Sequence, residues 1–146
     1  MKILMVCLGN ICRSPLAHGI LEKFANDKGF QWEIDSAGTG GWHIGSPPDH
    51  RSIAIAKSYG VDISNQSCRQ FEIDDFDKYD HIFVMDYSNL NDVRALVRNN
   101  RDYNKVSLFL KNDIVPDPYY DDTQFDVVYK MVEGRCFEII EEFNSQ

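Results

Sequence analysis

The start of the chain constrains the fold most, because an apolar run passes through a short loop into a helix start. Residues 3–6 are Ile-Leu-Met-Val, a continuously apolar stretch typical of a parallel strand that is buried on both faces. Ser14 and Pro15 predict a helix that begins at Pro15, with serine at the N-cap and proline in the first helical position. A strand, a tight loop and a helix in this order predict an α/β fold.

The loop between these two elements has the features of a cradle for a tetrahedral anion. It comprises Cys7-Leu8-Gly9-Asn10-Ile11-Cys12-Arg13-Ser14. Its backbone N–H groups can turn inward, Gly9 permits the angles required, and the positive end of the helix faces the same space. Arg13 adds a planar two-pronged contact to an oxyanion. These positive groups favour the thiolate form of Cys7, the form that attacks, and Ser14 could donate a hydrogen bond to it. The alternative is that Cys7 is a small buried hydrophobe.

Four further motifs are distributed along the whole length of the chain. They are Ser36-Ala37-Gly38-Thr39, Trp42-His43-Ile44-Gly45, Met85-Asp86-Tyr87-Ser88-Asn89-Leu90 and Pro116-Asp117-Pro118-Tyr119-Tyr120. Together with the Cys-x5-Arg-Ser loop, they make the sequence similar to the low-molecular-weight protein tyrosine phosphatase family, over one domain spanning residues 1–146. One departure is Gln66, which stands where the family often has histidine.

The chemistry needs a proton donor, because an alkoxide or phenoxide leaving phosphorus must be protonated and Arg13 cannot supply that proton. Asp117 is the best candidate, since prolines flank it and the aromatic rings of Tyr119 and Tyr120 can desolvate its carboxyl group. The resemblance implies the same role of general acid. The alternative is an ordinary turn aspartate before proline.

The resemblance also implies the remaining roles. Asn10 would hold the conformation of the loop, and Trp42, Tyr119 and Tyr120 would wall a crevice deep enough to favour aryl phosphates over phosphoserine. Cys7 would attack phosphorus to form a phosphocysteine, which water would hydrolyse with Asp117 as base. The expected partners are phosphotyrosine proteins or aryl phosphates, with phosphate-like anions as inhibitors. No metal or cofactor is needed.

Hydrophobic periodicity along the chain predicts an open four-stranded parallel sheet with helices on both faces, in a single domain. The expected strands cover residues 3–6 (central), 32–37 (edge), 81–85 and 106–110. The expected helices include 15–28 with Gly29 as the stop, 88–98 capped by Ser88, and 123–143 with Phe137 in the core. Residues 61–79 show no clean period and are expected to be irregular, with a short helical turn near Asp74 and Asp75 and with solvated charges. Ligands bind at the carboxyl ends of such strands, where Cys7, the 38–45 loop, Asp86 and Asp117 all lie.

Composition excludes several classes of function. The 146 residues carry a net charge of −8 and a pI near 4.8, which argues against a nucleic-acid partner. The cysteines and histidines lack zinc-ligand spacing, and no run is long enough to span a membrane. Without a signal-peptide pattern, we expect a cytoplasmic protein with reduced thiols, acting as a monomer.

Three alternatives compete with the tyrosine phosphatase. An arsenate reductase on the same fold would need further cysteines to relay a disulfide, and Cys68 and Cys136 lie in unsuitable contexts. A protein-arginine phosphatase has a similar loop, but with threonine at the position of Ile11. A catalytically silent phosphotyrosine-binding module is disfavoured by the presence of Cys7, Arg13 and Asp117 together.

Overall fold

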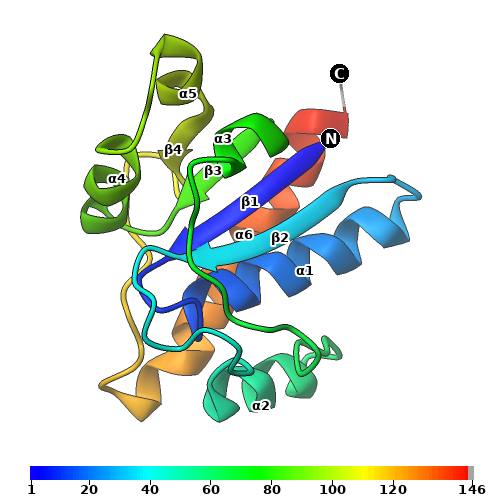
Figure 1. The fold of residues 1–146 in the computed structure, drawn as a ribbon. Coiled ribbons are helices and arrows are strands. Elements are labelled where there is room, and N and C mark those ends of the chain that lie inside the picture. Colours follow the sequence, from blue (N-terminus) through cyan, green and yellow to red (C-terminus); the bar gives the residue numbers. More distant parts are fainter. Residues whose placement is uncertain (145–146) are drawn as a thin grey trace.

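Four parallel strands form the centre of the computed structural model, which describes residues 1–144 (Figure 1). The strands are β1 (Lys2–Cys7), β2 (Glu33–Gly38), β3 (His81–Val84) and β4 (Val106–Leu108), in the order β2-β1-β3-β4. All three pairings are parallel. The predicted open, single-domain α/β sheet is therefore confirmed, with the apolar first strand inside the sheet and the alternating second strand at its edge.

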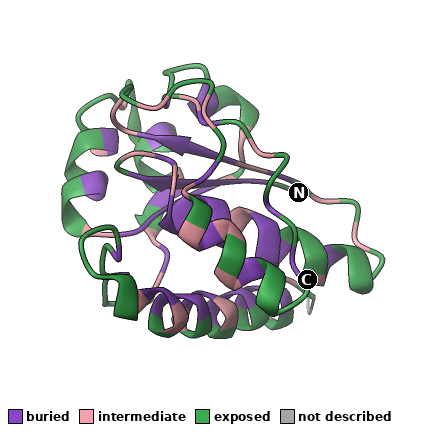
Figure 2. Ribbon diagram, turned by 90° about the horizontal axis from the view of Figure 1, so that it is seen from below, coloured by how far each residue is buried: buried purple, intermediate pink, exposed green. Residues whose placement is uncertain are grey.

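Helices cover both faces of the sheet. One face carries α1 (Arg13–Asp27), α2 (His50–Ser58) and α6 (Phe125–Asn144); the other carries α3 (Asp75–Lys78), α4 (Tyr87–Arg94) and α5 (Asn100–Lys105); a short 3-10 turn, η1 (Asp122–Gln124), precedes α6. Alternate side chains of β1 serve the two layers, since Ile3 and Met5 pack with α1 and α6 while Leu4 and Val6 pack with α3 and α4. Figure 2 shows the resulting buried strands between helices whose outer sides are exposed.

The expected core stripe of the last helix is largely present. Phe125, Val128, Val132 and Ile140 are buried, and Met131 and Phe143 are partly so. Phe137 is the exception: the prediction was wrong, because this side chain is 57% exposed. It lies one position beyond the stripe through residues 125, 128, 132, 136 and 139, and the rotation of about 100° per residue turns it to solvent.

The helix expected over residues 88–98 differs from the prediction in two ways. Its N-cap is Asp86, not Ser88: Asp86 is the extended residue after β3, and its carboxylate accepts a hydrogen bond from the Asn89 amide. The helix ends four residues early, and α5 follows under its own cap, Asn99. Asp86 and Asn99 each cap a separate short helix, so this stretch forms two helices instead of the single one expected.

Residues 61–79 contain the expected short helical turn, α3, but their charges are not all solvated. Asp75 is buried, and both of its carboxylate oxygens accept hydrogen bonds from Arg69, at 3.0 and 3.1 Å. Arg69 also binds Asp35 on β2, at 3.0 Å. This ion-pair network ties the irregular segment to the edge of the sheet.

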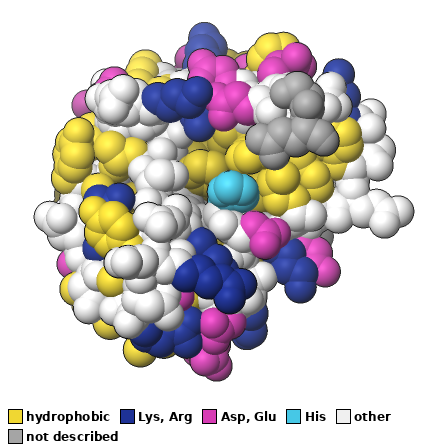
Figure 3. Space-filling view, turned by 90° about the horizontal axis from the view of Figure 1, so that it is seen from above, with side chains coloured by type: hydrophobic (Ala, Val, Ile, Leu, Met, Phe, Trp, Pro, Cys, Tyr) yellow, Lys and Arg dark blue, Asp and Glu magenta, His cyan; other side chains and the backbone are white. Residues whose placement is uncertain are grey.

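Charge is mixed on one face of the protein, and the whole chain carries a net charge of −8. Figure 3 shows one face on which acidic and basic side chains alternate around a patch of hydrophobic ones, without a broad basic area. Among the described helices, none is both long and apolar enough to cross a membrane. Any strong attraction for an anion must therefore be built locally.

Candidate active site

The carboxyl end of β1 and the start of α1 define the first half of the site. Cys7 is the last residue of β1 and Arg13 the first of α1, so residues 8–12, the cysteine loop, bridge the two elements. The Sγ atom of Cys7 lies 3.0 Å from Ser14 Oγ. Asn10 Nδ2 donates to that same hydroxyl oxygen at 2.9 Å, which leaves the serine hydrogen available to the sulfur. The arrangement can stabilise a thiolate.

Ser14 does not cap the helix, contrary to the prediction. The helix begins at Arg13 rather than Pro15, and its N-cap, Cys12, makes no side-chain capping bond. The Ser14 hydroxyl is engaged by Cys7 and Asn10 instead. Pro15 is still tolerated, because amides in the first turn have no partner within the helix.

The special backbone conformation in the loop belongs to Asn10, which has φ +58°, and not to Gly9. A left-handed residue is what turns successive N–H groups toward one side of such a loop. Asn10 is buried and held from behind: its Oδ1 accepts from the Arg69 amide at 3.0 Å, and its carbonyl accepts from Cys68 Sγ at 2.7 Å. Gly9 instead provides room for His43, whose Cδ2 would lie 3.3 Å from a Cβ at this position.

Arg13 is held by groups from two later segments. Its side chain is 3% exposed, and Nη1 donates to Asp86 Oδ2 at 2.6 Å and to the Val115 carbonyl at 3.0 Å. Its Nη2 lies 3.8 Å from Asp117 Oδ2. Burial opposes the charge of the guanidinium, but Cys7 and the two carboxylates outweigh it and raise the pKa of Arg13. The cation is fixed in position before any anion binds.

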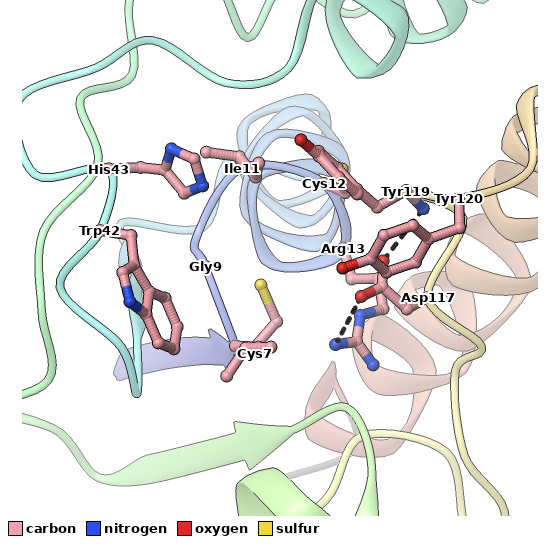
Figure 4. A pocket seen from close by; sticks show the side chains of 11 residues that line it. Cys7, Gly9, Ile11, Cys12, Arg13, Trp42, His43, Asp117, Tyr119 and Tyr120 are labelled. Carbon is pink, nitrogen blue, oxygen red and sulfur yellow. Dashed lines mark hydrogen bonds and ion pairs between the residues drawn. The ribbon is translucent and has the colours of Figure 1, made fainter.

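Asp117 lies in the loop of residues 111–121, the aspartate loop, between β4 and η1. Its side chain is 34% exposed, and its Oδ1 accepts a hydrogen bond from the Tyr119 amide at 3.1 Å. Figure 4 shows Asp117 beside the Arg13 guanidinium, facing the same space as the Cys7 sulfur. A carboxyl group here can reach an atom bound above the sulfur.

These groups line one pocket of about 290 Å³ (Figure 4). Its lining consists of Cys7, Leu8, Gly9, Ile11, Cys12, Arg13, Trp42, His43, Asp117, Tyr119 and Tyr120. The rim is aromatic and open to solvent, since Trp42 is 71% and Tyr120 90% exposed. Two residues predicted for the phosphate-binding loop, Asn10 and Ser14, do not belong to this lining, and both are buried.

Two residues of the site received no role from the sequence. His43 lines the pocket, and its place beside Trp42 in a glycine-rich loop was the available signal. Asp86 orients Arg13, and the available signal was its position near the carboxyl end of β3. The pairing of Asp86 with Arg13 could not be identified from sequence spacing, because the two residues are 73 positions apart.

All four cysteines are free and buried. Burial, reinforced by Asp49, raises the pKa of Cys12 to about 12, and burial raises that of Cys68 to about 11. Within residues 1–144 there is no group of three histidine, cysteine, aspartate or glutamate side chains that could hold a metal ion.

Comparison with known proteins agrees with this geometry. The family model described as low molecular weight phosphotyrosine protein phosphatase matches residues 2–146. The human protein of that name is 37% identical over 149 residues, covering 96% of this chain and 94% of its own.

Solved structures give the same picture. A product-state mimic of protein tyrosine phosphatase from Entamoeba histolytica superposes with a TM-score of 0.92 at 31% identity, covering 100% of this chain and 97% of the other. An arginine phosphatase from drosophila has a TM-score of 0.90 at 31% identity, covering 98% of each chain.

Proposed function

The chain belongs to the low molecular weight phosphotyrosine protein phosphatase family, and from this premise we propose that it hydrolyses phosphotyrosine through a phosphocysteine formed on Cys7. The observation that carries the proposal is the single pocket in which a cysteine sulfur, a buried guanidinium and an aspartate face one another. A nucleophile, an anion clamp and a proton donor are what a two-step phosphoryl transfer requires.

In the first step the Cys7 thiolate attacks phosphorus in line with the leaving oxygen. The sulfur–phosphorus bond forms as the phosphorus–oxygen bond breaks, and Asp117 gives its proton to the leaving oxygen. Arg13 and the amides of the cysteine loop hold the three equatorial oxygens, so their charge is stabilised where it develops. Ser14, 3.0 Å from the sulfur, stabilises the thiolate before attack.

In the second step water attacks the phosphocysteine. Asp117, now a carboxylate, removes a proton from that water, the sulfur–phosphorus bond breaks, and Cys7 departs as a thiolate. The Ser14 hydroxyl that favoured the thiolate also makes it a better leaving group. Phosphate is released and both groups return to their starting protonation states.

Substrate choice follows from the walls of the pocket. The rings of Trp42, Tyr119 and Tyr120 offer faces for an aryl group, and Ile11 adds an apolar branched side chain to the pocket lining. We infer phosphotyrosine proteins and aryl phosphates as substrates, phosphate-like anions as inhibitors, and a monomer acting in the cytoplasm. Free buried cysteines are in keeping with a reducing compartment.

The test of the mechanism is Cys7→Ser. Turnover should be abolished, while vanadate or phosphate binding should largely survive because the anion cradle remains. Cys136→Ala is the matched control, since this cysteine is also buried but lies against Ala17 on the helix layer. Substantial activity in pure Cys7→Ser protein would rule out the covalent route.

Protein-arginine phosphatase is the second candidate, because one structural neighbour bears that name. Ile11 favours the aryl substrate, since its side chain offers nothing to a charged guanidinium. A panel of phosphotyrosine, phosphoarginine and phosphoserine peptides separates the two activities. Arsenate reduction is disfavoured, because Cys68 and Cys136 are buried and the pocket lining does not include them.

A further inference from the structure

We propose that Arg51, a residue outside the pocket lining, is a positioning residue that couples the aspartate loop to the cysteine loop and thereby sets the position of Asp117. The inference rests on the proposed function, since it concerns the delivery of the proton from Asp117. Four observations carry it: how Arg51 is fixed at one end, what it holds at the other, how the aspartate loop is otherwise attached, and how stiff that loop is.

One end of Arg51 is fixed to the cysteine loop through Asp49. Asp49 caps α2 and accepts three hydrogen bonds from Arg51, from the backbone amide at 2.8 Å, Nε at 3.0 Å and Nη2 at 2.9 Å. The Asp49 amide in turn donates to the carbonyl of Ile11 at 2.8 Å. The guanidinium plane is thus set relative to the cysteine loop.

The other end of Arg51 holds the aspartate loop and the turn that follows it. Its Nη1 donates to the carbonyl of Tyr119 at 2.9 Å and to Asp122 Oδ1 at 2.5 Å. The guanidinium carbon also lies 5.2 Å from the Tyr119 ring centre and 4.7 Å from that of Phe125. Two hydrogen bonds and two aromatic faces therefore converge on this one cation.

Tyr119 transmits this position directly to the acid. Its carbonyl is held by Arg51, while its amide donates to Asp117 Oδ1 at 3.1 Å. The opposite side of Asp117 is attached through Val115, whose amide donates to the Met85 carbonyl at 2.8 Å and whose carbonyl accepts from Arg13. In the sequence, Asp117 lies midway between two residues whose backbones are anchored by hydrogen bonds, Val115 and Tyr119.

The segment between these anchors transmits displacement because it is stiff. Prolines at 116 and 118 fix two of the intervening φ angles. If Tyr119 is released, residues 116–118 should therefore move together and displace the Asp117 carboxyl group, because the segment cannot absorb the movement by local changes in φ. A misplacement of about 1 Å can cost a reaction about 10²-fold.

Loss of the Arg51 side chain should also lower stability, because the Asp49 side chain is only 9% exposed and would be left without its cation. The pair with Asp122 should contribute little, since that side chain is 81% exposed. Arg98 offers a matched control, because it also binds two carboxylates, of Asp77 and Asp102, and lies 5.9 Å from the Phe76 ring. Arg98 packs between α3 and α5, on the other face of the sheet.

The experiment compares Arg51→Ala, Arg51→Lys, Arg98→Ala and Asp117→Ala on a series of aryl phosphates whose leaving groups differ in acidity. The measured quantity is kcat/KM, which reports the steps up to departure of the phenol. Arg51→Ala should lower kcat/KM by about 10- to 10²-fold for phenyl phosphate. The loss should be much smaller for 4-nitrophenyl phosphate, whose leaving group needs little protonation. Vanadate affinity should barely change, and the thermal midpoint should fall about as far as in Arg98→Ala.

The other variants separate the possible outcomes. Arg51→Lys should recover only part of the loss, since a single ammonium cannot present the planar fork that bridges Asp49 and Tyr119. Arg98→Ala should leave the leaving-group dependence as in the wild type. An equal loss across the series, or no loss, in Arg51→Ala would overturn the positioning role. An equal loss of kcat/KM for good and poor leaving groups in Asp117→Ala itself would instead overturn the proposed acid.

Discussion

The two halves of the site are held in different ways. The cysteine loop is continuous with a central strand and a long helix; Asn10 within the loop and Ser14 on α1 are both buried and hydrogen-bonded. The aspartate loop is mostly exposed and is attached at Val115 and Tyr119 by individual hydrogen bonds. One half is part of the sheet and helix core, whereas the other is fastened to it.

The difference corresponds to two chemical tasks. Stabilising charge on a phosphoryl group is effective only when the donors are already in place, since any reorganisation during the reaction costs free energy. A proton donor must meet the leaving oxygen while substrates enter and leave past it. A rigid anion cradle beside an exposed acid meets both demands.

Loss of the acid tests this division most strongly. Asp117→Ala should lower turnover by about 10²–10⁴, the range for a positioned general acid, and should leave phosphate affinity nearly unchanged because the cysteine loop is intact. The measurement is kcat/KM across phenols of rising pKa together with a phosphate inhibition constant. If substrates with good and poor leaving groups suffer equally, Asp117 does not supply the proton.

The second test acts on the rigid half. Asp86→Ala removes the carboxylate that orients the buried Arg13, so we expect kcat/KM to fall by about 10- to 10²-fold and unfolding free energy by about 2–5 kcal/mol. Asp86→Asn is the informative companion, since it keeps an oxygen to accept from the Asn89 amide and so preserves the cap of α4.

Urea unfolding and steady-state kinetics distinguish the two roles of Asp86. The asparagine variant should be more stable than the alanine variant by about 1 kcal/mol, the value of a helix cap, yet equally impaired in catalysis. Full activity in Asp86→Asn would mean that the charge of Asp86 does not orient Arg13.

Sequence patterns predicted the cysteine loop because its parts are neighbours along the chain. An apolar strand, a glycine-asparagine turn and a helix start all lie within one short stretch, so spacing alone brought Cys7 and Arg13 to opposite ends of one loop. The error at Ser14 is instructive. Cap preference favoured a helix start there, but preference does not account for the competing partners, Cys7 and Asn10, that engage the hydroxyl.

The second half of the site could be predicted only in outline. The rule that ligands bind beyond the carboxyl ends of parallel strands indicated that the loops after the four strands would meet, and proline neighbours pointed to Asp117. The contacts that place it are tertiary: Asp86 reaches Arg13 across 73 residues and Arg51 reaches Tyr119 across 68. No local pattern encodes such pairings.

A smaller effect is expected from a substitution of Ile11. Ile11 lines the pocket as an apolar branched side chain that can pack on an aryl ring. Ile11→Thr should shift the ratio of phosphotyrosine to phosphoarginine activity toward phosphoarginine by about 10-fold, the scale of one or two methylene contacts. Competition between the two peptides measures the ratio, and a wild-type preference for phosphoarginine would contradict the assignment.

The last prediction tests whether the cysteine loop can move enough for Cys7 and Cys12 to form a disulfide. Cys12 lines the pocket together with Cys7, so it could capture a sulfenic acid on Cys7 as a disulfide and stop irreversible oxidation. Such a bond requires Cα atoms within about 7 Å. After peroxide and then thiol reductant, wild-type activity should recover nearly fully, and Cys12→Ser activity poorly.

The pH dependence of this capture follows from the burial of Cys12. Capture needs the thiolate, and the pKa of Cys12 is raised to about 12, by burial first and then by Asp49. Below that pKa the thiolate fraction rises about tenfold per pH unit, so protection should strengthen as pH rises from about 7 to 9. Equal recovery in wild type and Cys12→Ser at both pH values would mean that the cysteine loop is too rigid to bring the two sulfurs together.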